Sequence, residues 1–209
     1  MGIAVLVLGA SGTGKSASMR NFKKGEVGVF NVANKPLPFK GELDTVSTYD
    51  YNKIEEVLRK NTLKTYIIDD SQYLMAFANF QRAYEKGYDK FTQFAVDFKV
   101  LLDTITWGTS NDTVVYLLHH TETTETGAIK AKTIGKMLDQ QLTVEGLFSV
   151  VLLATTDGEH YKFITNGQPP AKSPIGMFDQ KEIDNDLKAV DDTIREYWNL
   201  KAAKKEGTK

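Results

Sequence analysis

The residues best suited to chemistry in this chain form a glycine-rich stretch close to its N-terminus. In order they are Gly9, Ala10, Ser11, Gly12, Thr13, Gly14, Lys15 and Ser16. They match the pattern G-x-x-x-x-G-K-[ST] at every fixed position, and glycines in such a loop let backbone N–H groups converge on phosphate oxygens. The pattern predicts that this stretch, with Ala17, binds nucleotide phosphates. Lys15 would reach the β- and γ-phosphates, and the Ser16 hydroxyl would hold Mg²⁺.

The sequence around the stretch fits this prediction. Residues 2–8 are an apolar run typical of a buried strand, and residues 15–22 can form a helix. A strand before and a helix after are the setting that a phosphate-binding loop requires, and the helix N-terminus would add partial positive charge. The alternative is a glycine-rich turn that contains a lysine by chance.

A second group follows another apolar run. Residues 65–68 are β-branched and aromatic, and Asp69 and Asp70 come directly after them. An acid at the end of such a strand is a common partner of a phosphate loop, where it holds Mg²⁺ largely through water. We therefore predict that Asp69 is a magnesium ligand. The alternative is a strand followed by a polar turn.

A third group is the pair His119 and His120, which follows the predicted strand 113–118. Adjacent residues of a strand point to opposite faces, so one of the two is expected to face the nucleotide. We choose His119 because it is nearer the strand, and we expect it to contact the γ-phosphate. The alternative is a pair of solvated loop histidines.

The elements that must position these residues alternate between strands and helices. Further strands are expected at 25–31, 148–154 and 161–165, and the last two form an antiparallel hairpin around Asp157-Gly158. This pattern predicts an α/β fold with a mostly parallel sheet, in which right-handed crossovers bring the strand C-termini to one edge. Residues 1–200 are expected to form one domain, and 201–209 a flexible lysine-rich tail.

Composition excludes several classes of site. The 209 residues include no cysteine and three histidines, which excludes disulfides and thiolate metal sites and disfavours a histidine-built one. The net charge of −1 excludes a broadly basic surface, so any nucleic-acid contact must be local. No apolar run approaches the roughly 20 residues of a membrane helix, and a cytoplasmic location without membrane contact is expected.

These motifs together resemble the RecA-like branch of phosphate-loop ATPases. More closely, the chain resembles compact phage-encoded RecA-like ATPases that include single-strand annealing recombinases. Besides the phosphate loop, Asp69-Asp70 and His119-His120, that likeness is carried by residues 34–38, 171–178 and 183–187.

The resemblance implies a RecA-like core, sandwiched by helices, that hydrolyses ATP with Mg²⁺. It implies a ring or filament of copies of the chain, in the host cytoplasm if the protein is phage-encoded, with single-stranded DNA bound in recombination or replication. A single-strand-binding protein is a possible further partner. In similar proteins a cation from the neighbouring subunit completes the site, and Lys172 stands where it is expected. The alternative is a solvated surface lysine.

One departure concerns the base that activates water. Similar enzymes place a glutamate just after the second strand, but residues 30–34 contain no acid. Asp70 is the best candidate for this catalytic role, and Glu122 is the second. Lysines at 130, 132 and 136 are candidates for DNA contact. Phe77, Phe80 and Tyr84 have a spacing that allows base stacking but is more typical of a helix core.

Two other functions stay open. A small-molecule kinase would need arginines clustered in a lid, whereas Arg20, Arg59, Arg82 and Arg195 are scattered. An assembly or remodelling ATPase directed at a protein partner needs no DNA. Its partitioning subclass carries an early loop lysine where this chain has Ala10. No guanine-reading Asn-Lys-x-Asp stretch occurs, which favours ATP.

Overall fold

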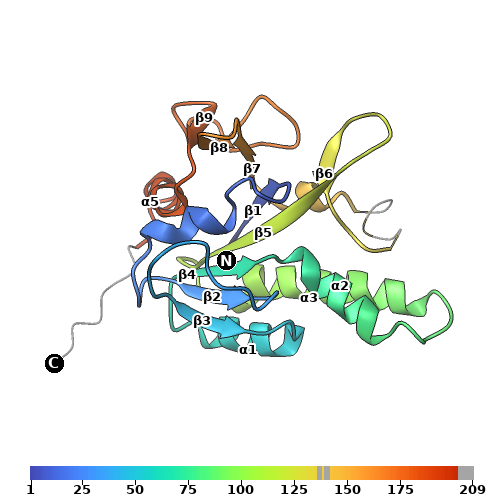
Figure 1. Cartoon of the computed structure of the whole chain (residues 1–209). Coiled ribbons are helices and arrows are strands. Elements are labelled where there is room, and N and C mark those ends of the chain that lie inside the picture. The colour runs from blue at the N-terminus through green and yellow to red at the C-terminus, as the bar shows by residue number, and fades with distance from the viewer. Residues whose placement is uncertain (136–137, 139–141, 202–209) are drawn as a thin grey trace.

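The structure is a computed structural model that describes residues 1–135, 138 and 142–201 (Figure 1). Lys136, and all of the expected tail except Lys201, lie outside the described residues. The chain has the predicted α/β fold: a mostly parallel sheet with helices on both faces. Among the described residues, no helix combines the length and apolar character needed to cross a membrane.

The described part of the chain contributes nine strands to the sheet, in the order β3-β2-β4-β5-β1-β7-β8-β9, with β6 paired to the end of β5. All neighbours from β3 to β7 are parallel, whereas β7-β8, β8-β9 and β5-β6 are antiparallel. The strands are β1 Ile3–Gly9, β2 Gly28–Asn31, β3 Asp44–Ser47, β4 Thr65–Asp69, β5 Val114–Thr123, β6 Ile129–Ala131, β7 Val150–Thr156, β8 Tyr161–Ile164 and β9 Glu182–Asp184.

Two helical layers cover the sheet, as Figure 1 shows. The helices α1, α2 and α3 cover one face, and α5 with the short helix η1 covers the other. The α-helices are α1 Tyr51–Lys60, α2 Gln72–Gln81, α3 Asp89–Gly108 and α5 Leu187–Tyr197; the 3₁₀ helices are η1 Ser16–Asn21 and η2 Val144–Leu147.

The central strands are apolar on both sides, and this divides the core in two. Along β5, Val115 and Leu117 join the core under α1 to α3, whereas Val114, Tyr116 and Leu118 join the core under α5. This alternation follows from the two-residue period of a strand. Strands buried on both faces are typical of parallel sheets between helices, so the apolar runs in the sequence indicated the architecture correctly.

The structure corrects several predicted elements. The segment after Lys15 is a six-residue 3₁₀ helix, not an α-helix, and Ser18 Oγ bonds back to the Lys15 carbonyl at 2.5 Å. Serine and asparagine compete for backbone groups in this way and weaken a short helix. The strand predicted at 113–118 is longer than expected, because β5 continues through both histidines to Thr123 and pairs with β6. The short strands β3 and β9 were not predicted.

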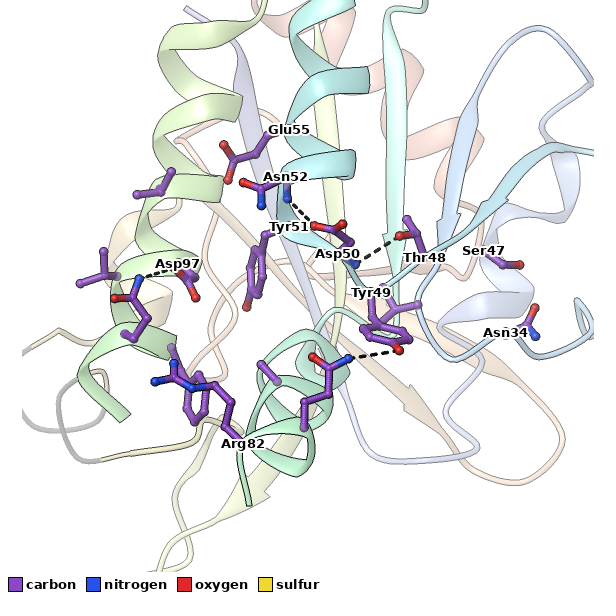
Figure 2. A pocket seen from close by; sticks show the side chains of 17 residues that line it. Asn34, Ser47, Thr48, Tyr49, Asp50, Tyr51, Asn52, Glu55, Arg82 and Asp97 are labelled. Carbon is purple, nitrogen blue, oxygen red and sulfur yellow. Dashed lines mark hydrogen bonds between the residues drawn. The ribbon is translucent and has the colours of Figure 1, made fainter. Parts of the chain in front are cut away.

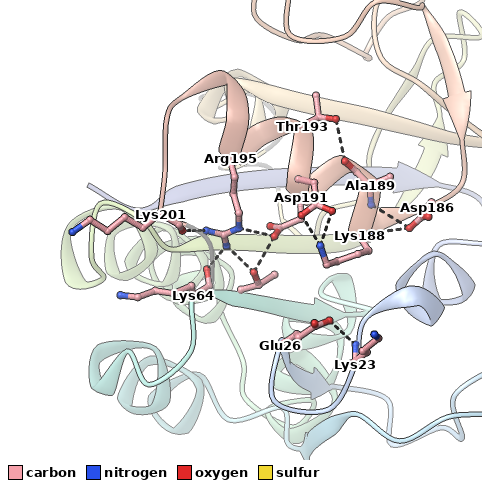
Figure 3. A network of polar contacts seen from close by, with 12 residues as sticks. Lys23, Glu26, Lys64, Asp186, Lys188, Ala189, Asp191, Thr193, Arg195 and Lys201 are labelled. Carbon is pink, nitrogen blue, oxygen red and sulfur yellow. Dashed lines mark hydrogen bonds and ion pairs between the residues drawn. The ribbon is translucent and has the colours of Figure 1, made fainter. Parts of the chain in front are cut away.

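A buried polar network ties α5 to the sheet (Figure 3). Arg195 Nε donates to Asp191 Oδ2 at 2.7 Å, and Arg195 Nη2 donates to Thr65 Oγ1 at 2.7 Å and to the Lys64 carbonyl at 2.8 Å. Tyr116 Oη donates to Asp191 Oδ1 at 2.9 Å. We call Thr65, Tyr116, Asp191 and Arg195 the α5 network.

Candidate functional site

The glycine-rich residues 9–16 leave the sheet at the end of β1, between two neighbouring strands. β1 ends at Gly9, opposite His120 of β5, and its other neighbour is β7. Gly12 and Gly14 have φ angles of 83° and 82°, in the left-handed region that glycine adopts without steric cost. The two glycines therefore give the loop its curvature at positions where a side chain would be strained.

Lys15 closes this loop from within. Its ammonium group donates to the carbonyls of Gly9 at 2.7 Å and Ala10 at 2.8 Å, and only 6% of the residue is exposed. Burial lowers the pKa of Lys15 to about 8, although Asp70 and Asp69 act in the opposite direction. The ammonium group thus lies inside the loop. An anion bound there could take the place of the two carbonyl oxygens as its partner.

Ser16 joins the phosphate loop to the acid at the end of β4. Its hydroxyl donates to Asp69 Oδ1 at 2.8 Å, across 53 positions of sequence. Burial raises the pKa of Asp69 to about 6, while the bond from Ser16 opposes that rise. The two residues predicted as magnesium ligands are therefore in direct contact.

Asp70 lies next to this pair in an unusual backbone conformation. Its φ angle is 59°, and its carboxylate is held by Lys35 Nζ at 2.5 Å and His120 Nε2 at 3.1 Å. Burial alone would raise the pKa of Asp70, but the bonds from His120 and Lys35 outweigh it and lower that pKa. Asp70 is thus an ionised, buried carboxylate beside Asp69. We call Lys15, Lys35, Asp69, Asp70 and His120 the loop cluster.

Of the two adjacent histidines, His120 and not His119 lies at the loop cluster. His119 is fully buried, with Nδ1 at 2.9 Å from Ser71 Oγ and Nε2 at 2.8 Å from the Lys132 carbonyl. Burial lowers its pKa to about 4, so it is neutral at pH 7. His120 is the histidine that reaches Asp70. The choice of His119 is corrected because proximity to the strand does not fix which side chain faces the site.

Lys35 was missed by sequence reasoning and is positioned by the segment after β2. Asn31 Nδ2 donates to the Lys35 carbonyl at 2.6 Å, and Lys35 N donates to Asn31 Oδ1 at 3.1 Å. Asn34 has a φ angle of 52° within this turn. At the end of β2 this chain therefore has an asparagine that shapes the following turn, and the turn brings the Lys35 cation to Asp70.

Two other candidates make their recorded contacts outside the loop cluster. Lys172 pairs by its backbone with Val151, which lies opposite Leu6, so in the sheet it is displaced from Gly9 along β1. Glu122 lies on the β5-β6 hairpin and forms an ion pair with Lys130 at 3.0 Å. Within one subunit, neither residue joins Asp69.

The candidate DNA contacts are spread over two segments. Lys130 and Lys132 belong to the β5-β6 hairpin and its exit. Phe77 packs on Tyr73 with ring centroids 5.4 Å apart, whereas Phe80 and Tyr84 are 74% and 100% exposed. Core packing, the more typical use of this spacing, thus applies to Phe77 but not to the other two aromatics.

A cleft of about 790 Å³ lies between α1, α2 and α3 (Figure 2). Tyr51, Arg82 and Asp97 are among its lining residues, and Asn34 at its edge precedes Lys35. The phosphate loop does not line it. The loop itself is filled by the Lys15 side chain, so an anion there must take over the bonds of that ammonium group.

The described residues contain no group of three or more histidine and acidic side chains arranged to hold a metal ion by themselves. Ser16 and Asp69 supply two oxygen ligands, the donor type that Mg²⁺ prefers, and Mg²⁺ commonly completes its shell with water and substrate phosphates. The donor set therefore fits Mg²⁺ bound together with a nucleotide. No family model matches the chain, and no curated protein matches its sequence.

Proposed function

We propose that this protein is a Mg²⁺-dependent ATPase of the RecA-like class that acts on single-stranded DNA as an oligomer. The observation that carries the ATPase proposal is the contact between Ser16 Oγ and Asp69 Oδ1, because it joins two separate motifs at one edge of the sheet. Lys15 lies in the same loop. A glycine-rich turn with an incidental lysine would not require this convergence.

Each residue of the loop cluster has a chemical role in this proposal. The Lys15 ammonium would leave the carbonyls of Gly9 and Ala10 and bond β- and γ-phosphate oxygens. Ser16 and Asp69 would hold Mg²⁺, which when bound neutralises charge on those oxygens. The negative charge of nucleotide phosphates favours the charged form of the Lys15 amine, so the pKa of Lys15 should rise on binding.

Asp70 is the group best placed to orient the attacking water. It is ionised, and its carboxylate is fixed by Lys35 and His120 on two sides. A carboxylate with a lowered pKa is a weak base, so it orients a water molecule better than it removes a proton from it. We therefore expect slow basal hydrolysis that an added cation or an effector accelerates.

Oligomerisation and DNA binding rest on the resemblance and on exposed groups. Lys172 lies away from the loop cluster of its own subunit, which is compatible with a role in a neighbouring one. Phe80 and Tyr84 expose aromatic rings, and such rings stack on unpaired bases without sequence preference. These two features support an assembling ATPase that binds single strands.

The decisive experiment compares ATP hydrolysis in the wild type, Lys15→Ala and Lys188→Ala. Lys188 forms an exposed pair with Asp192 and serves as a matched lysine control. We expect Lys15→Ala to abolish hydrolysis and weaken nucleotide binding, because the phosphates lose their principal side-chain cation, and Lys188→Ala to behave as wild type. Wild-type rates in Lys15→Ala would contradict the proposal.

Two additions test the rest of the proposal. Hydrolysis that rises steeply with protein concentration and with single-stranded DNA, and falls with salt, supports a DNA-dependent assembly. Hydrolysis indifferent to DNA favours an ATPase directed at a protein partner. Lys172→Ala should bind ATP but not turn it over, and mixing it with Lys15→Ala should restore activity if Lys172 acts across an interface.

A further inference from the structure

Asn185 has a buried amide group without a hydrogen-bond partner. The residue is 2% exposed, and within the described residues neither Nδ2 nor Oδ1 bonds another atom. A buried amide left unpaired is unfavourable, because it loses its bonds to water and gains none. The backbone around it, by contrast, is well bonded: Arg20 Nη1 donates to the Asn185 carbonyl at 2.6 Å.

This amide lies against the phosphate loop. A Cβ atom placed on Gly14 would lie 3.4 Å from Asn185 Nδ2 and 2.7 Å from Cδ1 of Tyr161. Asn185 N donates to the Tyr161 carbonyl at 3.2 Å, so the two residues are linked. Gly14, Tyr161 and Asn185 therefore meet at one place, and the Tyr161 ring, 46% exposed, lies between the loop and solvent.

Gly14, Tyr161 and Asn185 lie on the opposite side of β1 from the acidic end of the loop cluster, which indicates the part of a nucleotide they could contact. Asp69 ends β4 and His120 lies on β5, on one side of β1, whereas Tyr161 begins β8 and Asn185 follows β9, on the other side. A nucleotide whose γ-phosphate faces Asp69 and Asp70 must extend across the loop, away from β4. Its base then leaves the loop on the side of Tyr161 and Asn185.

We propose that Tyr161 and Asn185 form the nucleobase site and select adenine. The inference rests on the proposed function and assigns the base-reading residues of the same site. An amide offers one acceptor and one donor group side by side, which matches the N6 amino group of adenine and its adjacent ring nitrogen. The Tyr161 ring, which lies against Gly14 and is partly exposed, stacks on the base.

The test measures binding of ATP, GTP, purine riboside triphosphate and inorganic tripolyphosphate, each with Mg²⁺, by calorimetry. Tripolyphosphate has no base and reports on the phosphate loop alone. We expect wild type to bind ATP about 10- to 100-fold tighter than GTP or purine riboside triphosphate, which lacks the N6 amino group. The latter comparison needs no variant, so it stays informative if a substitution impairs folding.

Two variants assign the residues. Asn185→Ala should lose the preference for ATP over GTP while its affinity for tripolyphosphate stays within about twofold of wild type. Tyr161→Ser should weaken ATP and GTP together, and Tyr161→Phe should bind as wild type because the ring is kept.

Distinct results contradict the two proposals. Equal wild-type affinity for ATP, GTP and purine riboside triphosphate, or an unchanged ATP preference in Asn185→Ala, would overturn the base site. Failure of wild type to bind tripolyphosphate or any nucleotide would instead overturn the proposed function.

Discussion

Two buried ionic groups lie at different places in this sheet and differ in how completely their atoms are bonded. In the α5 network, Arg195 makes five hydrogen bonds, which equals the number of N–H donors of a guanidinium group. In the loop cluster, Lys15 bonds two carbonyls of its own loop, one fewer than the three N–H donors of an ammonium group. Asp70 of this cluster also has a left-handed φ angle.

The hydrogen bonds of the α5 network hold parts of the fold together, whereas those of the loop cluster could be exchanged for bonds to a ligand. The partners of Arg195 lie in α5, at the start of β4, in the segment between α3 and β5, and after α5. These bonds therefore join α5 to other elements of the fold. Lys15 bonds only carbonyls of its own loop in these contacts, and a phosphate group could take their place. Asp69 accepts a bond from Ser16, and a cation could take the place of that hydroxyl proton. The α5 network thus serves stability, and the loop cluster is the better candidate for chemistry.

The largest expected effect on stability is in the α5 network. Arg195→Ala leaves the buried Asp191 carboxylate without its cation, and removing one partner of a buried pair costs about 3–5 kcal/mol. Urea unfolding should show this loss. Lys188→Ala removes the surface pair with Asp192, about two helical turns from Arg195, and should change the free energy of unfolding by less than about 0.5 kcal/mol. Equal effects of the two substitutions would remove the contrast between the regions.

In the loop cluster, the opposite sign is expected for Asp69→Asn. Burial raises the pKa of Asp69 to about 6, so folding favours the protonated acid and the ionised form lowers stability. This cost is absent below pH about 4 and complete above pH about 7. Asparagine removes it, so the variant should gain up to about 3 kcal/mol at pH 8 and nothing at pH 4, while losing Mg²⁺-dependent hydrolysis. Unfolding curves across pH would contradict this if the gain at pH 8 were absent.

The adjacent histidines test the same contrast within one strand. His119→Ala removes the contacts of the buried ring with Ser71 Oγ and with the Lys132 carbonyl, and should cost about 1–3 kcal/mol. His120→Ala should cost less than about 1 kcal/mol, but should lower hydrolysis about 10- to 100-fold because Asp70 loses one of its two supports. Thermal unfolding and turnover of both variants check the assignment. The reverse pattern would favour His119 as the nucleotide-facing residue.

A small effect on stability is also expected at Lys35. Its side chain is 59% exposed, so Lys35→Ala should change the free energy of unfolding by less than about 1 kcal/mol. The pKa of Asp70 should nevertheless rise, because a bond that lowers it is removed. Carboxyl NMR titration measures that rise, and an unchanged pKa would show that His120 alone keeps Asp70 ionised.

The features of the fold that sequence could predict depend on local pattern. The apolar runs before Gly9 and Asp69 identified the central strands. The strands β3, β6 and β9 have three or four residues and partly exposed side chains, so their alternation is too short to recognise. Their pairing depends on neighbours that fold next to them.

The parts of the candidate site that sequence could not predict depend on contacts between distant segments. Lys35 meets Asp70 because β2 and β4 are neighbours in the sheet, with Asn31 opposite Asp69. Nothing local to residues 31–35 indicates that order. The choice between His119 and His120 likewise depends on how β5 is rotated in the sheet, which the two adjacent letters do not reveal.

The strand β5 links the regions compared above through a single rigid element. It begins beside Asp112, whose carbonyl accepts from Arg195, passes through Tyr116 of the α5 network and reaches His120 of the loop cluster. Beyond His120 the strand pairs with β6, and Lys132 N donates to the His120 carbonyl. The β5-β6 hairpin is thus continuous with the backbone that carries the contact between His120 and Asp70, so a displacement of the hairpin would change the position of His120.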